Sequence, residues 1–180
     1  GNLGRAVAQY RSAAEHDAEN LEARIRLARL LTAGGVLDEA GAVIEQAMAL
    51  APEDPEVRAT RATLSMRLGN VDEAVAEARA ALEDAPMLLP AHLILISERV
   101  QAGDQSAALE RLDALLADDA FEGEERRGLD LLRLNILASM GDTEALKNQL
   151  AEMADSYPEE TRFRVALAQI LASEGDLEGA

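Results

Sequence analysis

The sequence predicts an all-α fold made of antiparallel helix pairs stacked along the chain. The glycines Gly1, Gly35, Gly69, Gly103, Gly141 and Gly175 are separated by 34, 34, 34, 38 and 34 residues. A regular period of this length indicates one supersecondary unit that is copied, rather than a fold with a single central core. Aromatic residues make up only 2% of the chain although 48% of it is hydrophobic. The apolar residues are therefore mainly Ala and Leu, which favour helices.

Each repeated glycine predicts the turn between the two helices of a pair. Glycine readily adopts the left-handed conformation that ends a helix. In five of six cases the next residue is Asn or Asp, which can cap the second helix; these residues are Asn2, Asn70, Asp104, Asp142 and Asp176. Val36 is the exception, so we expect the weakest cap there. Prolines near positions 52, 86 and 158 end second helices, and Pro55 suits the first position of the next helix.

This pattern predicts ten helices. The expected pairs are 20–33 with 37–50, 55–68 with 71–84, 88–101 with 105–117, and 124–139 with 143–155, preceded by a lone helix at 3–16 and followed by one at 159–173. We expect a single array over residues 1–180. Its parts are the second helix of a truncated first unit (1–19), full units at 20–54, 55–88, 89–122 and 123–160, and the first helix of a truncated last unit (161–180). The chain is therefore expected to be a fragment of a longer protein.

The one spacing of 38 residues indicates a four-residue insertion. It falls between Ala117 and Glu125, where Ala120 stands at the position of an expected proline. We expect an irregular loop in this segment.

Composition and charge disfavour several classes of function. The net charge is −17, and a chain this acidic is repelled by nucleic-acid phosphates and anionic membrane surfaces. There is no cysteine, which excludes disulfides and thiolate chemistry. No apolar run is long enough to span a bilayer. The basic residues are 16 Arg and one Lys, a bias that suggests a bacterial genome; the cytoplasm and the periplasm both remain open as compartments.

At positions counted from the repeated glycines, the chain resembles the tetratricopeptide repeat. The family prefers a small residue seven before the turn glycine, Ala five after, a large apolar residue nine after, Ala twelve after and Pro seventeen after. For these five positions, in the same order, the best matches here are Ala28, Ala62 and Ala168; Ala40, Ala74 and Ala108; Tyr10, Ile44, Leu112 and Leu150; Ala13, Ala47 and Ala81; and Pro52, Pro86 and Pro158. The resemblance implies a right-handed α-solenoid, with first helices lining a concave groove and second helices forming the convex wall.

The chain also departs from the family pattern. The early Trp of the repeat is absent, and the fourth full unit, which carries Leu134, Leu146 and Met153, is the most divergent. Arg61, Arg99 and Arg133 occupy sites where apolar residues are usual. Some members of the family grip a C-terminal carboxylate with Lys and Asn, but the corresponding sites here hold other residues, so an adaptor of that kind is disfavoured.

If first helices line a groove, three columns of residues share one helical face, ten, six and three positions before each glycine. Two columns are mostly apolar and flank a polar row. The residues expected to contact a partner are Ile25, Arg29, Thr32, Thr63, Met66, Leu93, Ser97, Val100, Leu131, Asn135 and Gln169. The alternative is that the apolar columns only pack the helices together.

A further column stands eleven positions before the glycines. It consists of Arg24, Arg58, His92 and Arg164, interrupted by Asp130. One interpretation is a rim that favours acidic partners. The other is that long side chains cover Ala-rich surface while their charged heads remain in water.

The sequence therefore predicts a non-enzymatic scaffold that binds a peptide or protein segment in its groove. We find no phosphate-binding loop, dinucleotide fingerprint or catalytic triad pattern, and we expect no cofactor and no metal. Two alternatives remain open. The unfinished units at both ends favour self-association through the terminal helices, or the chain is the accessory region of a larger enzyme or thioredoxin-like chaperone.

Overall fold

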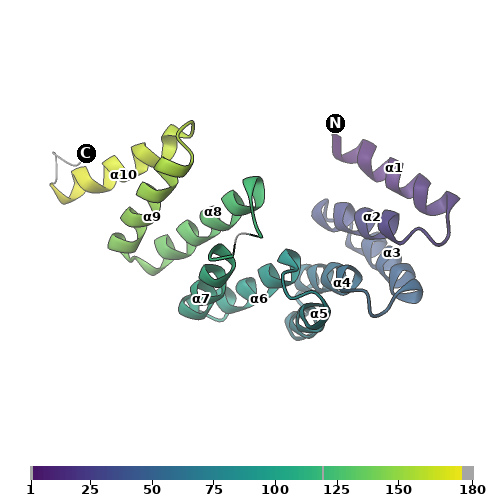
Figure 1. Ribbon diagram of the computed structural model, residues 1–180. Helices are drawn as coiled ribbons and strands as arrows, with labels where there is room; N and C mark the ends of the chain where they lie inside the picture. Colours follow the sequence, from purple (N-terminus) through teal and green to yellow (C-terminus); the bar gives the residue numbers. More distant parts are fainter. Residues whose placement is uncertain (1, 119, 176–180) are drawn as a thin grey trace. The chain divides into compact units, whose positions relative to one another are not determined.

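The computed structural model describes residues 2–118 and 120–175, and these form ten helices and no strand. The helices are α1 (Asn2–His16), α2 (Leu21–Ala33), α3 (Leu37–Leu50), α4 (Pro55–Leu68), α5 (Val71–Asp84), α6 (Leu89–Gln101), α7 (Gln105–Leu116), α8 (Gly123–Met140), α9 (Thr143–Ser156) and α10 (Thr161–Glu174) (Figure 1). The predicted all-α fold and all ten predicted helices are confirmed. Gly1 and residues 176–180 lie outside the described residues.

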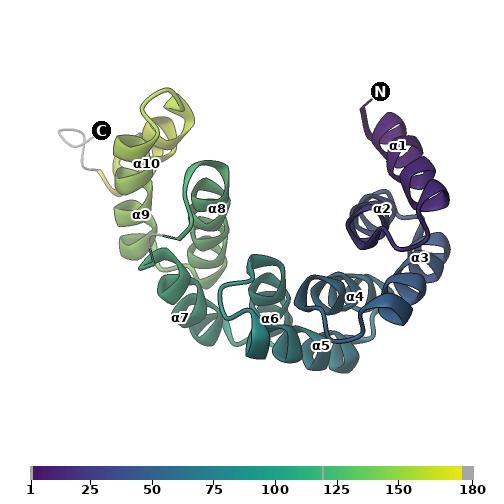
Figure 2. The same ribbon diagram turned by 45° about the vertical axis from the view of Figure 1, so that its right-hand side comes forward.

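The chain divides into two compact units, residues 1–102 with α1–α6 and residues 103–180 with α7–α10. In the N-terminal unit, α4 packs against α5 within its pair and against α2 and α6, the first helices of the neighbouring pairs. Figure 2 shows α2, α4 and α6 following one another, with α3 and α5 beside them. In the C-terminal unit, α8 packs against α7 and α9, and α9 packs against α10. The expectation of one continuous array stays a prediction.

The turn glycines adopt the backbone conformation that the sequence predicts. Gly35, Gly69, Gly103, Gly141 and Gly175 all have positive φ angles, between 72° and 84°. A Cβ atom at any of them would meet nothing within 4 Å, so the left-handed backbone, and not lack of space, is the reason for glycine.

The predicted helix caps are only partly present. The Asp104 carboxylate accepts a hydrogen bond from the backbone N–H of Ala107 (3.2 Å), and that of Asp142 accepts one from Ala145 (3.0 Å). Val36 provides no side-chain cap, as predicted, but Asn70 provides none either. The prediction for Asn70 is therefore wrong. Asn2 lies inside α1 as its first residue, and Asp176 is outside the described residues.

The cores are built largely from small side chains. Ala40, Ala47, Ala74 and Ala78 are completely buried in the N-terminal unit, and this lets neighbouring helices approach closely. The larger Ile44 and Leu112, at the same position of two different repeats, are 2% and 0% exposed. Each unit thus has its own apolar interior, made mainly where second helices meet first helices.

The four inserted residues lengthen a helix as well as a loop. Helix α8 has 18 residues, whereas α2, α4 and α6 have 13 or 14. Helix α7 ends at Leu116 and α8 begins at Gly123, and Phe121 between them is buried. The predicted start of this helix at residue 124 is thus correct to within one residue, and residues 123–125 of the inserted region belong to the first turn of α8.

Candidate binding surface on the first helices

In the N-terminal unit, the surface formed by α2, α4 and α6 is here called the first-helix face. Ile25 and Thr32 on α2 are only 4% and 3% exposed. The Thr32 hydroxyl donates a 2.8 Å hydrogen bond to the carbonyl oxygen of Ala28 in its own helix. These two residues stabilise the helix packing, as the alternative interpretation expects, and they offer no surface to a partner.

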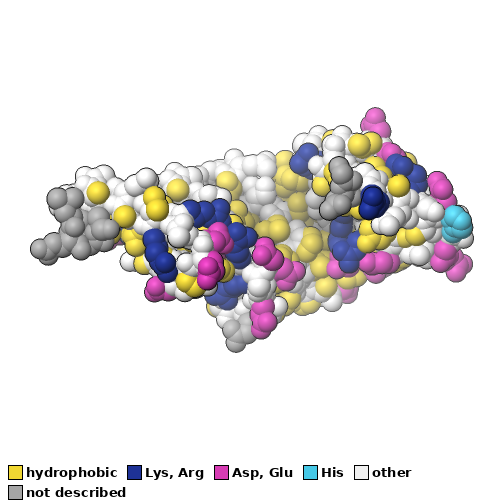
Figure 3. Space-filling view, turned by 90° about the horizontal axis from the view of Figure 1, so that it is seen from above, with side chains coloured by type: hydrophobic (Ala, Val, Ile, Leu, Met, Phe, Trp, Pro, Cys, Tyr) yellow, Lys and Arg dark blue, Asp and Glu magenta, His cyan; other side chains and the backbone are white. Residues whose placement is uncertain are grey.

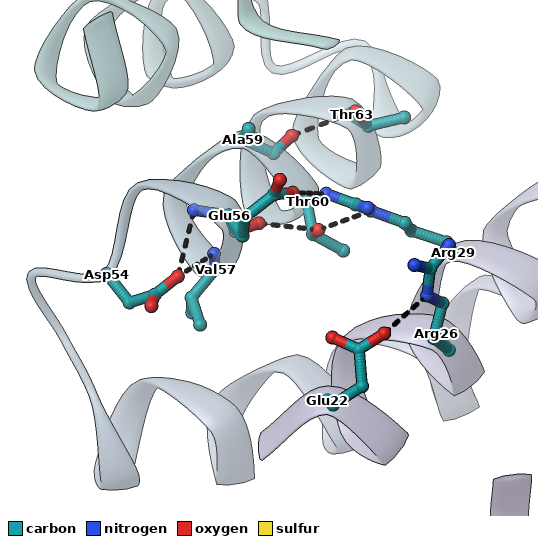
Figure 4. Close-up of polar contacts among 9 residues, drawn as sticks. All are labelled: Glu22, Arg26, Arg29, Asp54, Glu56, Val57, Ala59, Thr60 and Thr63. Atoms are coloured by element: carbon teal, nitrogen blue, oxygen red, sulfur yellow. Dashed lines mark hydrogen bonds and ion pairs between the residues drawn. The ribbon is translucent and has the colours of Figure 1, made fainter. Parts of the chain in front are cut away.

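The α2 side of this face carries a cluster of paired charges (Figure 4). Arg29 forms an ion pair with Glu56 of α4 and donates a 3.0 Å hydrogen bond to the Thr60 hydroxyl. That hydroxyl donates in turn to the carbonyl oxygen of Glu56 (2.7 Å). Arg26 pairs with Glu22 one turn earlier on α2 (2.7 Å). The four charged groups cancel, so Arg29 is not a free cation at this surface.

The start of α4 is held in place by its cap. The Asp54 carboxylate accepts hydrogen bonds from the backbone N–H groups of Glu56 (2.9 Å) and Val57 (3.1 Å) (Figure 4). This cap fixes the first turn of α4, and with it the backbone of Glu56. Further along the helix, the Thr63 hydroxyl donates to the carbonyl oxygen of Ala59 (2.9 Å), so its donor is already used.

The α4–α6 side of the first-helix face is apolar and uncharged at its centre. Met66 and Val100 are half-buried, and Leu93 is 38% exposed. The Gln101 side chain bridges the two helices by donating to the Ser97 hydroxyl (3.2 Å) and contacting the Met66 sulfur (3.6 Å). Apolar surface remains open here, as it also does at Leu50 and Leu68 elsewhere in the unit. In the space-filling view, basic side chains lie beside acidic ones instead of forming a separate strip (Figure 3).

The C-terminal unit places its predicted residues differently. Leu131 is half-buried and packs against the apolar cluster that contains Leu150, Met153 and Phe163. Asn135 and Gln169 are exposed and line one pocket of about 360 Å³ between α8, α9 and α10. The pocket is also lined by Leu134, Ala138, Leu146, Leu150 and Ile170. We call this cavity the carboxamide pocket.

The column of basic residues has a structural role that neither sequence interpretation anticipated. Each member reaches backward to carbonyl oxygens at the end of the preceding second helix or just after it. The contacts are Arg24 to Ala14, Asp17 and Asn20 (3.0–3.4 Å), Arg58 to Pro52 (3.1 Å), His92 to Pro86 (2.8 Å) and Arg164 to Ala154 (3.3 Å). Since a carbonyl only accepts, Nε2 of His92 is the donor. The final carbonyls of a helix lack partners within it. Arg24 and Arg164 reach two such groups, at Ala14 and Ala154, and the other accepting carbonyls belong to the loops that follow the helices.

Asp130 interrupts the column with the opposite chemistry. It accepts a 2.7 Å hydrogen bond from the Tyr157 hydroxyl at the end of α9. Burial, and then this hydrogen bond, raise the pKa of Tyr157 to about 12. In the sequence, the basic column can be recognised because a basic residue recurs at the same repeat position, close to the turn between one unit and the next.

The arginines that depart from the family pattern are explained by ion pairs. Arg61 on α4 contacts Glu73 (2.9 Å) and Glu77 (3.3 Å) of α5. Arg133 on α8 contacts Asp113 of α7 (2.7 Å) and the buried side chain of Gln149 on α9. Arg99 contacts the neighbouring Glu98 (3.3 Å).

Among the described residues, no group of three or more His, Asp or Glu side chains is arranged to hold a metal ion. None of the described helices combines the length and the hydropathy needed to cross a membrane. His16, one of the two histidines, contacts the carbonyl oxygen of Ser12 in its own helix (2.7 Å).

Comparison with known proteins agrees with this geometry. A family model described as tetratricopeptide repeat matches residues 1–64 and 35–93. Among solved structures, a thermophilic TPR protein from Thermus thermophilus superposes with a TM-score of 0.76 at 20% identity, covering 94% of this chain and 92% of that one. YrrB, a TPR protein with an unusual peptide-binding site, gives a TM-score of 0.61 at 18% identity, covering 94% and 86%. No curated protein matches the sequence significantly.

Proposed function

Because the chain belongs to the tetratricopeptide repeat family, we propose that it is a non-enzymatic scaffold that binds a peptide or protein segment on its first helices. The fold is that of a protein–protein interaction scaffold and is typically non-catalytic. The observation that carries the finer proposal is the open apolar surface of α4 and α6. There Leu93 is 38% exposed, and Met66 and Val100 are half-buried.

The proposed contacts differ in kind between the two ends of the first-helix face. On α4 and α6, Leu93, Met66 and Val100 supply apolar area, while Ser97 and Thr63 supply hydroxyl oxygens that can still accept hydrogen bonds. On α2, Arg29 contributes as one half of a neutral pair with Glu56. In the C-terminal unit, Leu131, Asn135 and Gln169 provide the corresponding surface. Ile25 and Thr32 are left out because they are buried.

This proposal is tested by selecting a random dodecapeptide library against the immobilised chain and measuring the affinity of the selected peptides. Leu93→Asp places a charge in the centre of the open apolar surface. We expect it to weaken the binding of the selected peptides by about tenfold or more, which corresponds to about 1.4 kcal/mol. Fluorescence anisotropy with labelled peptides measures the change.

Leu50→Asp is the matched control, because Leu50 is 43% exposed but lies at the end of α3, a second helix. Its affinity for the peptides should equal that of the unmodified chain, and circular dichroism should show the same helicity in both variants. Equal binding by the Leu93→Asp variant, or no peptide selected at all, would contradict the proposal.

A further inference from the structure

We propose that the carboxamide pocket accepts one uncharged apolar side chain of a bound polypeptide, while Asn135 and Gln169 hydrogen-bond the backbone of the same segment. The inference rests on the proposed function and adds the chemistry of the segment that is bound. It assigns this part of the recognition to α8, α9 and α10, which all lie in the C-terminal unit.

The carboxamides of Asn135 and Gln169 differ from the rest of the polar row because neither is held by another of the described residues. The polar row contains five residues, one on each first helix. Arg29 is paired with Glu56, Thr63 donates to a carbonyl of its own helix, and Ser97 accepts from Gln101. Within the part of the chain that the structure describes, the side chains of Asn135 and Gln169 form no hydrogen bond. Both are exposed, and they are one 34-residue period apart, so they occupy the same position on α8 and α10.

Two carboxamides are suited to binding a polypeptide backbone. Each carries donors and an acceptor, and a peptide unit likewise presents one N–H and one C=O. Two carboxamides can therefore hold an extended backbone without any charge. None of the described residues that line the pocket is charged. A charged side chain entering it would lose hydration and find no opposite charge in return, which favours a neutral occupant.

The pocket lies where the fourth unit differs in sequence from the other repeats. Five residues after the turn glycine, Ala40, Ala74 and Ala108 are completely buried. The same position in the fourth unit holds Leu146, which is half-buried and lines the pocket above the buried Leu150. The volume of about 360 Å³ lies at the small end of the range of about 300–1,000 Å³ for ligand pockets. It suits one or two apolar side chains.

The experiment uses capped tripeptides with glycine on either side of a central Leu, Glu or Lys, added to the isotope-labelled chain of residues 1–180. We expect the leucine probe to shift the side-chain amide signals of Asn135 and Gln169 and the methyl signals of Leu146 and Leu150. The Glu and Lys probes should bind about tenfold more weakly or not measurably, because their charges would be desolvated without a partner.

Two variants separate the pocket from the rest of the surface. The double substitution Asn135→Ala with Gln169→Ala should weaken the leucine probe by about tenfold, as expected for the loss of hydrogen bonds of about 0.5–1.5 kcal/mol net each. Asn148→Ala removes an exposed carboxamide of α9 that does not line the pocket, and it should leave the affinity for the leucine probe unchanged. Ala138→Phe fills the pocket from an exposed position on α8 and should abolish the methyl shifts while helicity is retained.

Other outcomes would overturn the inference. Equal shifts with the charged probes would show that the pocket does not select an apolar side chain. Nuclear Overhauser contacts from residues 176–180 to the Leu146 methyls in the free protein would assign the pocket to the chain's own segment. Dodecapeptides that respond to Leu93→Asp but not to the double substitution would leave the proposed function standing and overturn this inference alone.

Discussion

Arg133 occupies a position where the repeat family usually has an apolar residue, and it connects three helices of the C-terminal unit. It contacts Asp113 on α7 and the Gln149 side chain on α9, which is 1% exposed. A buried amide without a partner costs free energy. By donating a hydrogen bond to the Gln149 side chain, Arg133 removes part of the cost of burying it. The sequence identifies Arg133 as unusual, but its partners, 20 and 16 residues away, become visible only once the helices are packed.

Tyr157 gives a pH-dependent prediction at the same scale. Its folded-state pKa of about 12 lies above the ordinary value of 10. A raised folded-state pKa stabilises the protein while the group is protonated in both states, and this stabilisation is lost as pH rises from about 10 to about 12. In a Tyr10→Phe background, where Tyr157 is the single tyrosine, the tyrosinate absorbance should appear near pH 12. Urea unfolding should become easier over the same interval.

Tyr157→Phe removes the titrating hydroxyl while keeping the ring. This variant should lose the part of the pH dependence between pH 10 and pH 12 that belongs to Tyr157. A tyrosinate transition at pH 10 would show that the hydroxyl is neither buried nor held by Asp130.

At the scale of helices, the turns were predicted more reliably than the caps. Positive φ angles at the repeated glycines follow from the backbone freedom of one residue type, which is a local property. Capping also depends on how the side chain turns toward the helix. Asn70 and Asp104 have similar φ and ψ angles, −84° and 66° against −97° and 66°, yet only Asp104 caps. Helix α8 begins and ends within one residue of its predicted bounds, 124 and 139.

The uncapped start of α3 gives a prediction at this scale. Val36 has φ and ψ angles of −88° and 66°, close to those of the capping Asp104, and its side chain is 48% exposed. The aspartates at N-cap positions of the described helices, Asp54, Asp104 and Asp142, all cap their helices, so Val36→Asp should stabilise the protein by about 1 kcal/mol through a new cap. Chemical unfolding of this variant should show a higher midpoint than the original chain. Val36→Ala, which removes the side chain without adding an acceptor, should not show this gain.

At the scale of the whole molecule, neighbouring helices provide the packing, and each unit has its own apolar clusters. Stability of such an array is expected to be a sum of local contributions. Ile44 in the N-terminal unit and Leu112 in the C-terminal unit stand at the same repeat position and are both buried. This pair permits a matched test of local stability.

We expect Leu112→Ala and Ile44→Ala each to cost about 2–5 kcal/mol. In hydrogen exchange, the first should accelerate exchange mainly in α7–α9 and the second mainly in α2–α4. Equal acceleration along all ten helices by either variant would show that the chain unfolds as one cooperative body.

The period of the glycines, read without any structure, determined the fold class and the positions of the helices. These follow from local backbone preferences and from helical periodicity, which are properties of short stretches of chain. Only the tertiary structure decided which predicted contact residues remain open. Ile25 and Thr32 are buried, Arg29 is neutralised by Glu56, and Asn135 and Gln169 stay exposed beside a pocket. The reason is that the burial and pairing of a side chain depend on residues of other helices, which the helix positions alone do not reveal.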